Sequence, residues 1–223
     1  MVQETVGDCE KDSCVKIDLK YPQVEGNDPI AQKINHKIEL QLFQKINRSE
    51  DSVNWGREKE LNRFINEYYK IKRDFAHLHF NYEFTASAEV TAQSRQLVSI
   101  YITSYTYTGG AHPMTYREFI NLNPEDGSKI EMQNFFSNFE GFKELVERRL
   151  RAENNVPEDA PWTKHFYSDR FTLPTEMGFT GQGLKLIYGL YEIQPYAAGF
   201  KELTIAYDTL VNYMDPELIS GIQ

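Results

Sequence analysis

Apolar and polar side chains alternate from residue 82 to residue 105, and this alternation constrains the fold more than any other feature of the sequence. Only the polar stretch around Ser94 and Arg95 interrupts it. Successive side chains of a strand point to opposite faces of a sheet, so a period of two residues predicts two long strands, each with one buried face. We expect them to form an antiparallel hairpin, which a third strand over residues 114–122 would extend into a meander.

Helical patterns precede and follow these strands. Asn27-Asp28-Pro29 is typical of a helix start, with a polar cap before a proline at the first helical position. Apolar residues then recur every four positions, at Ile30, Ile34, Ile38, Leu42 and Ile46. A second amphipathic pattern covers residues 61–75. A third helix is expected after Ser137, whose spacing to Glu140 predicts a capping box.

The remaining periodic segments complete the prediction of the fold class. Further strands are expected over residues 15–21, 184–190 and 203–207, and no repeat of fixed period is present. Strands that fall in groups, separated by amphipathic helices, are typical of α+β proteins. We therefore predict an α+β fold in which antiparallel sheets carry helices packed on one face.

Charge and hydropathy exclude several classes of partner. The formal net charge of −9 argues against nucleic acid, because phosphates repel an acidic surface, and it favours a cationic partner. No apolar run reaches the length of about 20 residues that spans a bilayer, so no transmembrane segment is expected in this chain.

The two cysteines leave two interpretations open. Cys9 and Cys14 can close a small disulfide loop, which would indicate an oxidising compartment, and two free thiols of a cytosolic protein fit the same spacing. A lone pair of cysteines gives poor support for zinc. His77 and His79 would share one face of a strand, but no third ligand follows, so we predict no metal and no other cofactor.

Two irregular stretches interrupt the strands and are the candidate functional segments. The first contains Tyr107, Gly109, Gly110 and His112 ahead of Pro113; the glycines allow a reversal, and His112 is either a plain turn residue or a ligand contact. The second, residues 191–199, contains Tyr191, Pro195 and Tyr196; it is either a stiff bend or a recognition loop. Neither stretch contains a catalytic motif, and we assign no catalytic residue.

These stretches carry a resemblance to a known family. Tyr-Thr-Gly-Gly-Ala-His at 107–112, the Asn-x-x-x-Gly connection followed by Phe-Phe at 135–136, and Tyr-Glu-Ile-Gln-Pro-Tyr-Ala-Ala-Gly at 191–199 resemble a bacterial extracytoplasmic domain family. That family includes the outer part of the lysozyme-sensing anti-sigma factor RsiV. Residues 9 to about 110 are similar to the N-terminal domain that RsiV shares with the peptidoglycan deacetylase PdaC. The resemblance implies two closely joined subdomains, residues 1–110 and 111–223.

The resemblance also implies where the protein acts and what it does. It implies an extracytoplasmic protein, in the periplasm or at the cell surface, exported or held by a lipid anchor, and it favours the Cys9–Cys14 disulfide. The deacetylase domain of PdaC and the sigma-binding segment of RsiV have no counterpart here, so neither activity carries over. We expect a noncatalytic protein that binds a lysozyme-like muramidase or peptidoglycan. One alternative is a structural lipoprotein. The other is a glycan-modifying envelope enzyme that uses His112.

Overall fold

The computed structural model describes residues 1–6, 14–43, 46, 56–77 and 79–222. Its contacts divide the chain into two compact units, Met1–Glu89 with Ile102–Tyr116, and Val90–Tyr101 with Arg117–Gln223. The two subdomains implied by the resemblance, residues 1–110 and 111–223, meet at one boundary in the sequence. Each of the two compact units instead contains part of the strands over residues 82–122. The α+β class predicted from the sequence is confirmed.

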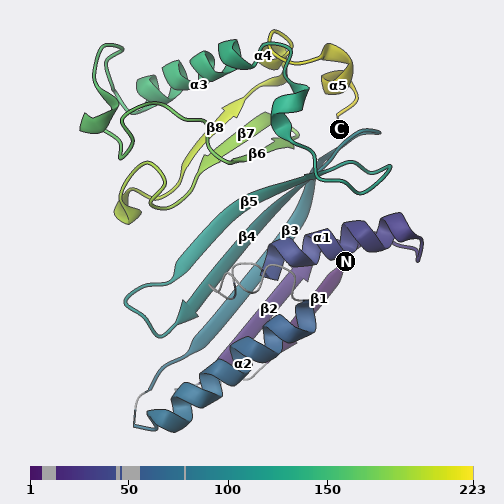
Figure 1. Cartoon of the computed structure of the whole chain (residues 1–223), viewed down its shortest axis with the longest axis vertical. Coiled ribbons are helices and arrows are strands. Elements are labelled where there is room, and N and C mark those ends of the chain that lie inside the picture. Colours follow the sequence, from purple (N-terminus) through teal and green to yellow (C-terminus); the bar gives the residue numbers. More distant parts are fainter. Residues whose placement is uncertain (7–13, 44–45, 47–55, 78, 223) are drawn as a thin grey trace. The chain divides into compact units, whose positions relative to one another are not determined.

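A five-stranded sheet has the order β1-β2-β3-β4-β5, and all of β1 and β2 and most of β3 and β4 belong to the first unit (Figure 1). Its strands are β1 (Val2–Val6), β2 (Val15–Tyr21), β3 (Tyr82–Gln93), β4 (Val98–Thr108) and β5 (Met114–Leu122). The short connections after β3 and β4 require antiparallel neighbours, as predicted. In contrast, β2 and β3 pair in parallel, with Val15 opposite Tyr82. The helical segment between these two strands supplies the crossover that a parallel pair needs.

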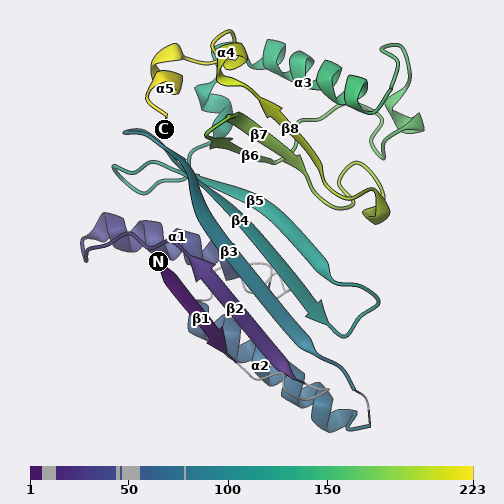
Figure 2. The same cartoon turned by 180° about the vertical axis from the view of Figure 1, so that it is seen from behind.

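Two helices, α1 (Pro29–Phe43) and α2 (Arg57–Asp74), lie on the same face of this sheet (Figures 1 and 2). Asp28 caps α1 as predicted, because its Oδ1 accepts hydrogen bonds from the backbone N–H groups of Ile30 and Ala31, both at 3.0 Å. Rings from both helices and from β3 meet in the core of the unit, at Phe43, Phe64, Tyr68, Tyr82 and Phe84. This aromatic cluster fixes the helices on the sheet.

The second unit contains a three-stranded antiparallel sheet, β6 (Glu176–Thr180), β7 (Gly183–Tyr188) and β8 (Lys201–Ile205). Helices α3 (Phe139–Glu153), α4 (Tyr207–Leu210) and α5 (Pro216–Ser220) and the 3-10 turns η2 (Met132–Phe135), η3 (Trp162–Lys164) and η4 (Tyr196–Ala198) surround it. The buried face of α3 packs on the sheet through Phe142, Val146 and Leu150. Leu184, Leu186, Leu203 and Ile205 meet them from the strands.

The cap of α3 differs from the prediction. Asn138, and not Ser137, is the cap residue, and its Oδ1 accepts a hydrogen bond from the N–H of Gly141 at 3.0 Å. The backbone N–H of Ser137 donates to the carbonyl of Tyr213 at 2.9 Å, which keeps the chain extended one residue longer. The predicted capping box therefore does not form, although the helix does.

Polar side chains hold the outer edge of β6. Ser99 accepts a hydrogen bond from the N–H of Phe179 at 2.9 Å and donates to Oδ1 of Asn121 at 2.7 Å. Asn121 in turn donates to the carbonyl of Met177 at 2.7 Å, and Thr91 donates to the carbonyl of Phe179 at 2.6 Å. Side chains thus satisfy the backbone groups that a neighbouring strand would otherwise pair.

A buried arginine fixes the loop that follows α3. The guanidinium of Arg151 donates to Glu147 at 3.0 Å and to the carbonyls of Pro157 and Ala160 at 2.9 and 3.0 Å. It also lies 4.5 Å from the ring centroid of Trp162, whose indole N–H donates to Glu147 at 3.1 Å. The loop over residues 154–162 is therefore held to the helix by charge-assisted hydrogen bonds.

Candidate functional site

The Gly-Gly turn projects from the first unit as an exposed connection between β4 and β5. Gly109 has φ of 77°, a left-handed conformation that favours glycine, and a side chain there would meet Phe80 at 3.4 Å. Gly110 and His112 are exposed, and Tyr107 is half-buried. Nδ1 of His112 lies 2.9 Å from the carbonyl of Pro113. A carbonyl can only accept, so Nδ1 is the nitrogen that donates. His112 therefore stands at the rim of the sheet with its ring orientation held locally.

The stretch over residues 191–199 forms an exposed loop of the second unit. Tyr191 is 50% exposed and has φ of 67°, which is rare and strained for a bulky side chain. Its ring centroid lies 5.6 Å from that of Tyr196, at an angle of 39° between the ring planes. Pro195 is exposed and begins the 3-10 turn η4, which Gly199 ends with φ of 72°. The loop thus presents a pair of tyrosine rings beside a rigid proline turn.

Contacts beneath the loop keep it in place. Ile193 is buried, and its carbonyl accepts a hydrogen bond from the N–H of Tyr167 at 3.0 Å. The carboxylate of Glu192 accepts from the N–H of Gly189 at 2.7 Å. Burial of that carboxyl raises the pKa of Glu192, and hydrogen bonds from the backbone of Gly189 and Thr175 oppose the rise. Both interpretations of the stretch are therefore compatible with the structure, since the bend is stiff and its tyrosines are accessible.

A network of charges lies on the sheet of the same unit. Glu202 forms ion pairs with Arg117 at 2.6 Å and with Lys185 at 2.7 Å. Burial acts to raise the pKa of Glu202, but hydrogen bonds and attraction from the two basic groups outweigh it and lower the pKa overall. The guanidinium of Arg117 also lies 4.5 Å from the ring centroid of Phe200. These contacts connect β5, β7 and β8 with Phe200, which follows the loop over residues 191–199.

The predicted site residues fall in two places. The turn that contains His112 belongs to the first unit, and the loop that contains Tyr191, Pro195 and Tyr196 belongs to the second, so each is described as a separate candidate. The prediction that His77 and His79 share a strand face is wrong, because β3 begins only at Tyr82. Both histidines are exposed in the connection after α2. Among the described residues, no group of three or more His, Cys, Asp or Glu side chains is placed to hold a metal ion.

The disulfide stays a prediction. Cys9 lies outside the described residues, whereas Cys14 is buried immediately before β2, and its N–H donates to the side chain of Asn81 at 3.2 Å. No helix in the described part of the chain combines the length and apolar character needed to cross a membrane.

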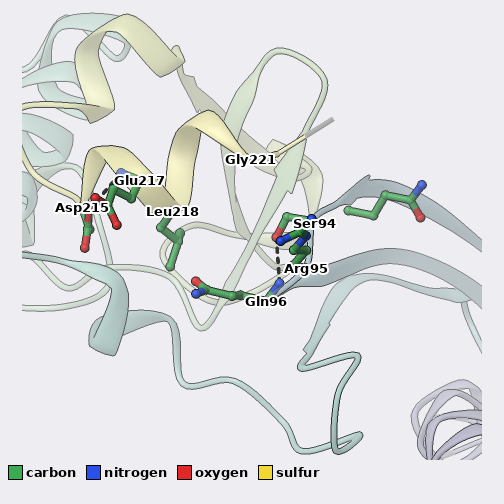
Figure 3. Close-up of a pocket in the computed structure, with 8 residues that line it drawn as sticks. Ser94, Arg95, Gln96, Asp215, Glu217, Leu218 and Gly221 are labelled. Carbon is green, nitrogen blue, oxygen red and sulfur yellow. Dashed lines mark hydrogen bonds between the residues drawn. The ribbon is translucent and has the colours of Figure 1, made fainter.

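The structure contains a polar pocket that the sequence did not predict. Its volume is about 600 Å³. One wall is the connection between β3 and β4, with Ser94, Arg95 and Gln96, and the other is α5 with its cap residue, Asp215 (Figure 3). Both walls belong to the second unit. They are more than one hundred residues apart in the chain, so no local pattern could have revealed the pocket.

Comparison with known proteins identifies two domains. Residues 9–115 match the family model described as deacetylase PdaC, and residues 131–208 match that of a protein family of unknown function, DUF3298. The sequence has no significant match among curated proteins.

Two solved structures share the fold along almost the whole chain. A DUF3298 family protein from Pseudomonas aeruginosa PAO1 is 22% identical, with a TM-score of 0.62, over 97% of this chain and 94% of that chain. A member of the same family from Bacteroides fragilis NCTC 9343 is 18% identical, with a TM-score of 0.65, over 99% of this chain and 94% of that chain. The chain therefore contains a PdaC-like domain followed by a DUF3298 domain.

Proposed function

We propose that this chain is a noncatalytic binding protein of the cell envelope, in the periplasm or at the cell surface, and that its partner is a basic muramidase of the lysozyme kind. The PdaC-like and DUF3298 domains support an envelope-associated role. The observation that carries the proposal is the ring pair of exposed Tyr191 and half-buried Tyr196 on a loop held from beneath. The resemblance to the RsiV family supplies the class of partner.

The two rings have the properties of binding anchors. A tyrosine offers a large contact area and a hydroxyl while it loses little side-chain entropy on binding, since only two torsions become fixed. The buried Ile193 and the bonds of Glu192 hold the backbone beneath the rings, so binding would not have to order the loop. The strained φ of Tyr191 also supports a binding role for the loop. Such strain persists only where the surrounding structure enforces it, and it is common at binding sites.

The charge of the chain favours a basic protein over an acidic or neutral partner. The formal net charge is −9, and most of the excess of acidic residues lies in the second unit, which also carries the tyrosine loop. Opposite net charges speed up association, and salt screens that attraction over a Debye length of about 8 Å at physiological ionic strength. We therefore expect binding that weakens as salt is raised.

The turn around His112 is proposed as a second contact. It is exposed, and Gly109 and Gly110 place no side chain that would hinder a partner. Because it belongs to the other unit, its contribution is separate from that of the tyrosine loop and has to be measured by itself.

Calorimetric titration of the full chain with a basic lysozyme, and in parallel with soluble peptidoglycan fragments, tests the proposal. Tyr191→Ala and Tyr196→Ala should each weaken lysozyme binding about tenfold or more, as is usual for anchor residues. Tyr69→Ala is the matched control, because Tyr69 is 60% exposed on α2 and lies outside both candidate segments. Binding of the fragments alone would assign the site to glycan, and the absence of heat with both ligands would refute the proposal.

A further inference from the structure

We propose that the pocket between the β3–β4 connection and α5 binds a short peptide that carries both a free ammonium and a free carboxylate group. The juxtaposition that supports this is a guanidinium, Arg95, on one wall and two carboxylates, Asp215 and Glu217, on the other. The site is distinct from the tyrosine loop and from the turn around His112, so it can be tested independently of them.

The charges of the pocket are opposite in sign but do not neutralise one another. Within the part of the chain that the structure describes, Arg95 makes no ion pair within 4.0 Å with Asp215 or with Glu217. Figure 3 shows Arg95 towards one end of the pocket and the two acidic residues towards the other, with Leu218 and Gln96 between them. All three charged residues are exposed and accessible to a ligand. A ligand with one charge at each end would meet both groups at once.

Both walls are formed before any ligand binds. Ser94 Oγ accepts hydrogen bonds from the N–H groups of Gln96 at 3.2 Å and Leu97 at 3.1 Å, and Leu97 is completely buried. On the other side, Asp215 Oδ1 accepts from the N–H of Glu217 at 2.9 Å, and Ile219 anchors α5 in the core of the unit. A ligand would therefore pay little for ordering the site.

The lining selects against simpler ligands. A simple anion would meet repulsion from Asp215 and Glu217, and a simple cation would meet repulsion from Arg95. The side-chain amide of Gln96 both donates and accepts, which suits the N–H and C=O groups of a peptide backbone. Half-buried Leu218 offers a small apolar contact for a side chain. A volume of about 600 Å³ lies in the usual range for small-molecule sites, and an extended tripeptide reaches about 10 Å.

The test uses trialanine and two blocked forms of it with the full ¹⁵N-labelled chain. N-acetyl-trialanine lacks the ammonium group, and trialanine amide lacks the carboxylate group. Titration of the unmodified chain with trialanine should shift the amide resonances of Ser94, Gln96 and Leu218. Each blocked form should bind at least about fivefold more weakly, because one of its two charge contacts is lost.

Matched variants then assign each charge to its wall. Arg95→Gln should weaken trialanine about fivefold but leave trialanine amide unchanged, since that ligand has no carboxylate for Arg95 to hold. Glu217→Gln should weaken trialanine and leave N-acetyl-trialanine unchanged. Arg149→Gln and Glu153→Gln, exposed substitutions on α3 outside the pocket, are the controls and should change nothing.

Three results would overturn the proposal. The first is the absence of shifts at the pocket amides with trialanine, and the second is equal binding of the free and blocked peptides. The third is a loss of affinity in Arg95→Gln that is the same for trialanine and trialanine amide. None of these results bears on lysozyme binding, so the two proposals fail separately.

Discussion

Ser99→Ala is expected to destabilise the second unit strongly although it removes a single oxygen atom. Ser99 is completely buried, accepts the N–H of Phe179 and donates to Asn121. Without the hydroxyl, the amide of Phe179 is left buried without its acceptor, which costs about 1–3 kcal/mol, and the lost bond to Asn121 adds about 0.5–1.5 kcal/mol. We expect the free energy of unfolding to fall by about 2–4 kcal/mol.

Ser104→Ala provides a matched control on the same strand. Ser104 is 2% exposed, and among the described residues its hydroxyl has no hydrogen-bond partner. Removal of an unsatisfied buried hydroxyl should be neutral or slightly stabilising. Because the same side chain is truncated at two buried positions of β4, the difference between the variants isolates the hydrogen bonds of Ser99.

Urea unfolding, combined with native-state hydrogen exchange, measures both the size and the place of the effect. Exchange at the Phe179 amide should accelerate in Ser99→Ala by more than at other amides of the sheet, since its acceptor is gone. The reasoning is refuted if Ser99→Ala and Ser104→Ala change the free energy of unfolding by the same amount, or if the Phe179 amide keeps its protection.

Three further predictions concern packing and charge. Gly178→Ala should lower the free energy of unfolding by about 1–3 kcal/mol, because the added Cβ would lie 2.0 Å from the ring of Phe119. Gly181→Ala is the control and should be tolerated, since its Cβ would meet nothing within 4 Å. Thermal unfolding of the two variants measures the difference. Arg151→Met should cost about 2–4 kcal/mol, since Glu147 and the carbonyls of Pro157 and Ala160 all lose their buried donor, and a denaturant midpoint equal to that of the unmodified chain would contradict this. The lowered pKa of Glu202 means that its ion pairs stabilise the fold above pH of about 4.5 and less as pH falls through the lowered pKa, so the stability difference between the unmodified chain and Glu202→Gln should shrink on acidification.

Local patterns predicted most of the helices and strands. The alternation over residues 82–105 marks β3 and β4, and the Asp28 cap marks the start of α1, because both signals depend on near neighbours in the sequence. The first apolar position assigned to α1 is less accurate: Ile30 is 38% exposed, and Ala31 is buried in its place. The burial face of a helix is set by what it packs against, so its edge can shift by one residue.

Features set by long-range contacts were not predicted. The strand β1 has apolar residues only at its ends and exists through its pairing with β2, and the parallel pairing of β2 with β3 leaves no mark on the alternation of either strand. The polar pocket was not predicted either, because its walls, which contain Arg95 and Asp215, are far apart in the sequence. Of the candidate site residues, Pro195 and Tyr196 were singled out because they lie in an irregular stretch after a predicted strand, and their role in binding stays a prediction. The sequence indicates neither the ring contact of Tyr191 with Tyr196 nor the positive φ of Tyr191.

Hydrogen exchange of the full chain, with and without a saturating basic lysozyme, tests the binding proposal most directly. The binding proposal predicts that exchange slows on complex formation across residues 191–199 and 107–113. Exchange of the α2 amides around Tyr69 should stay unchanged. Protection confined to other surfaces, or identical exchange with and without lysozyme, would contradict it.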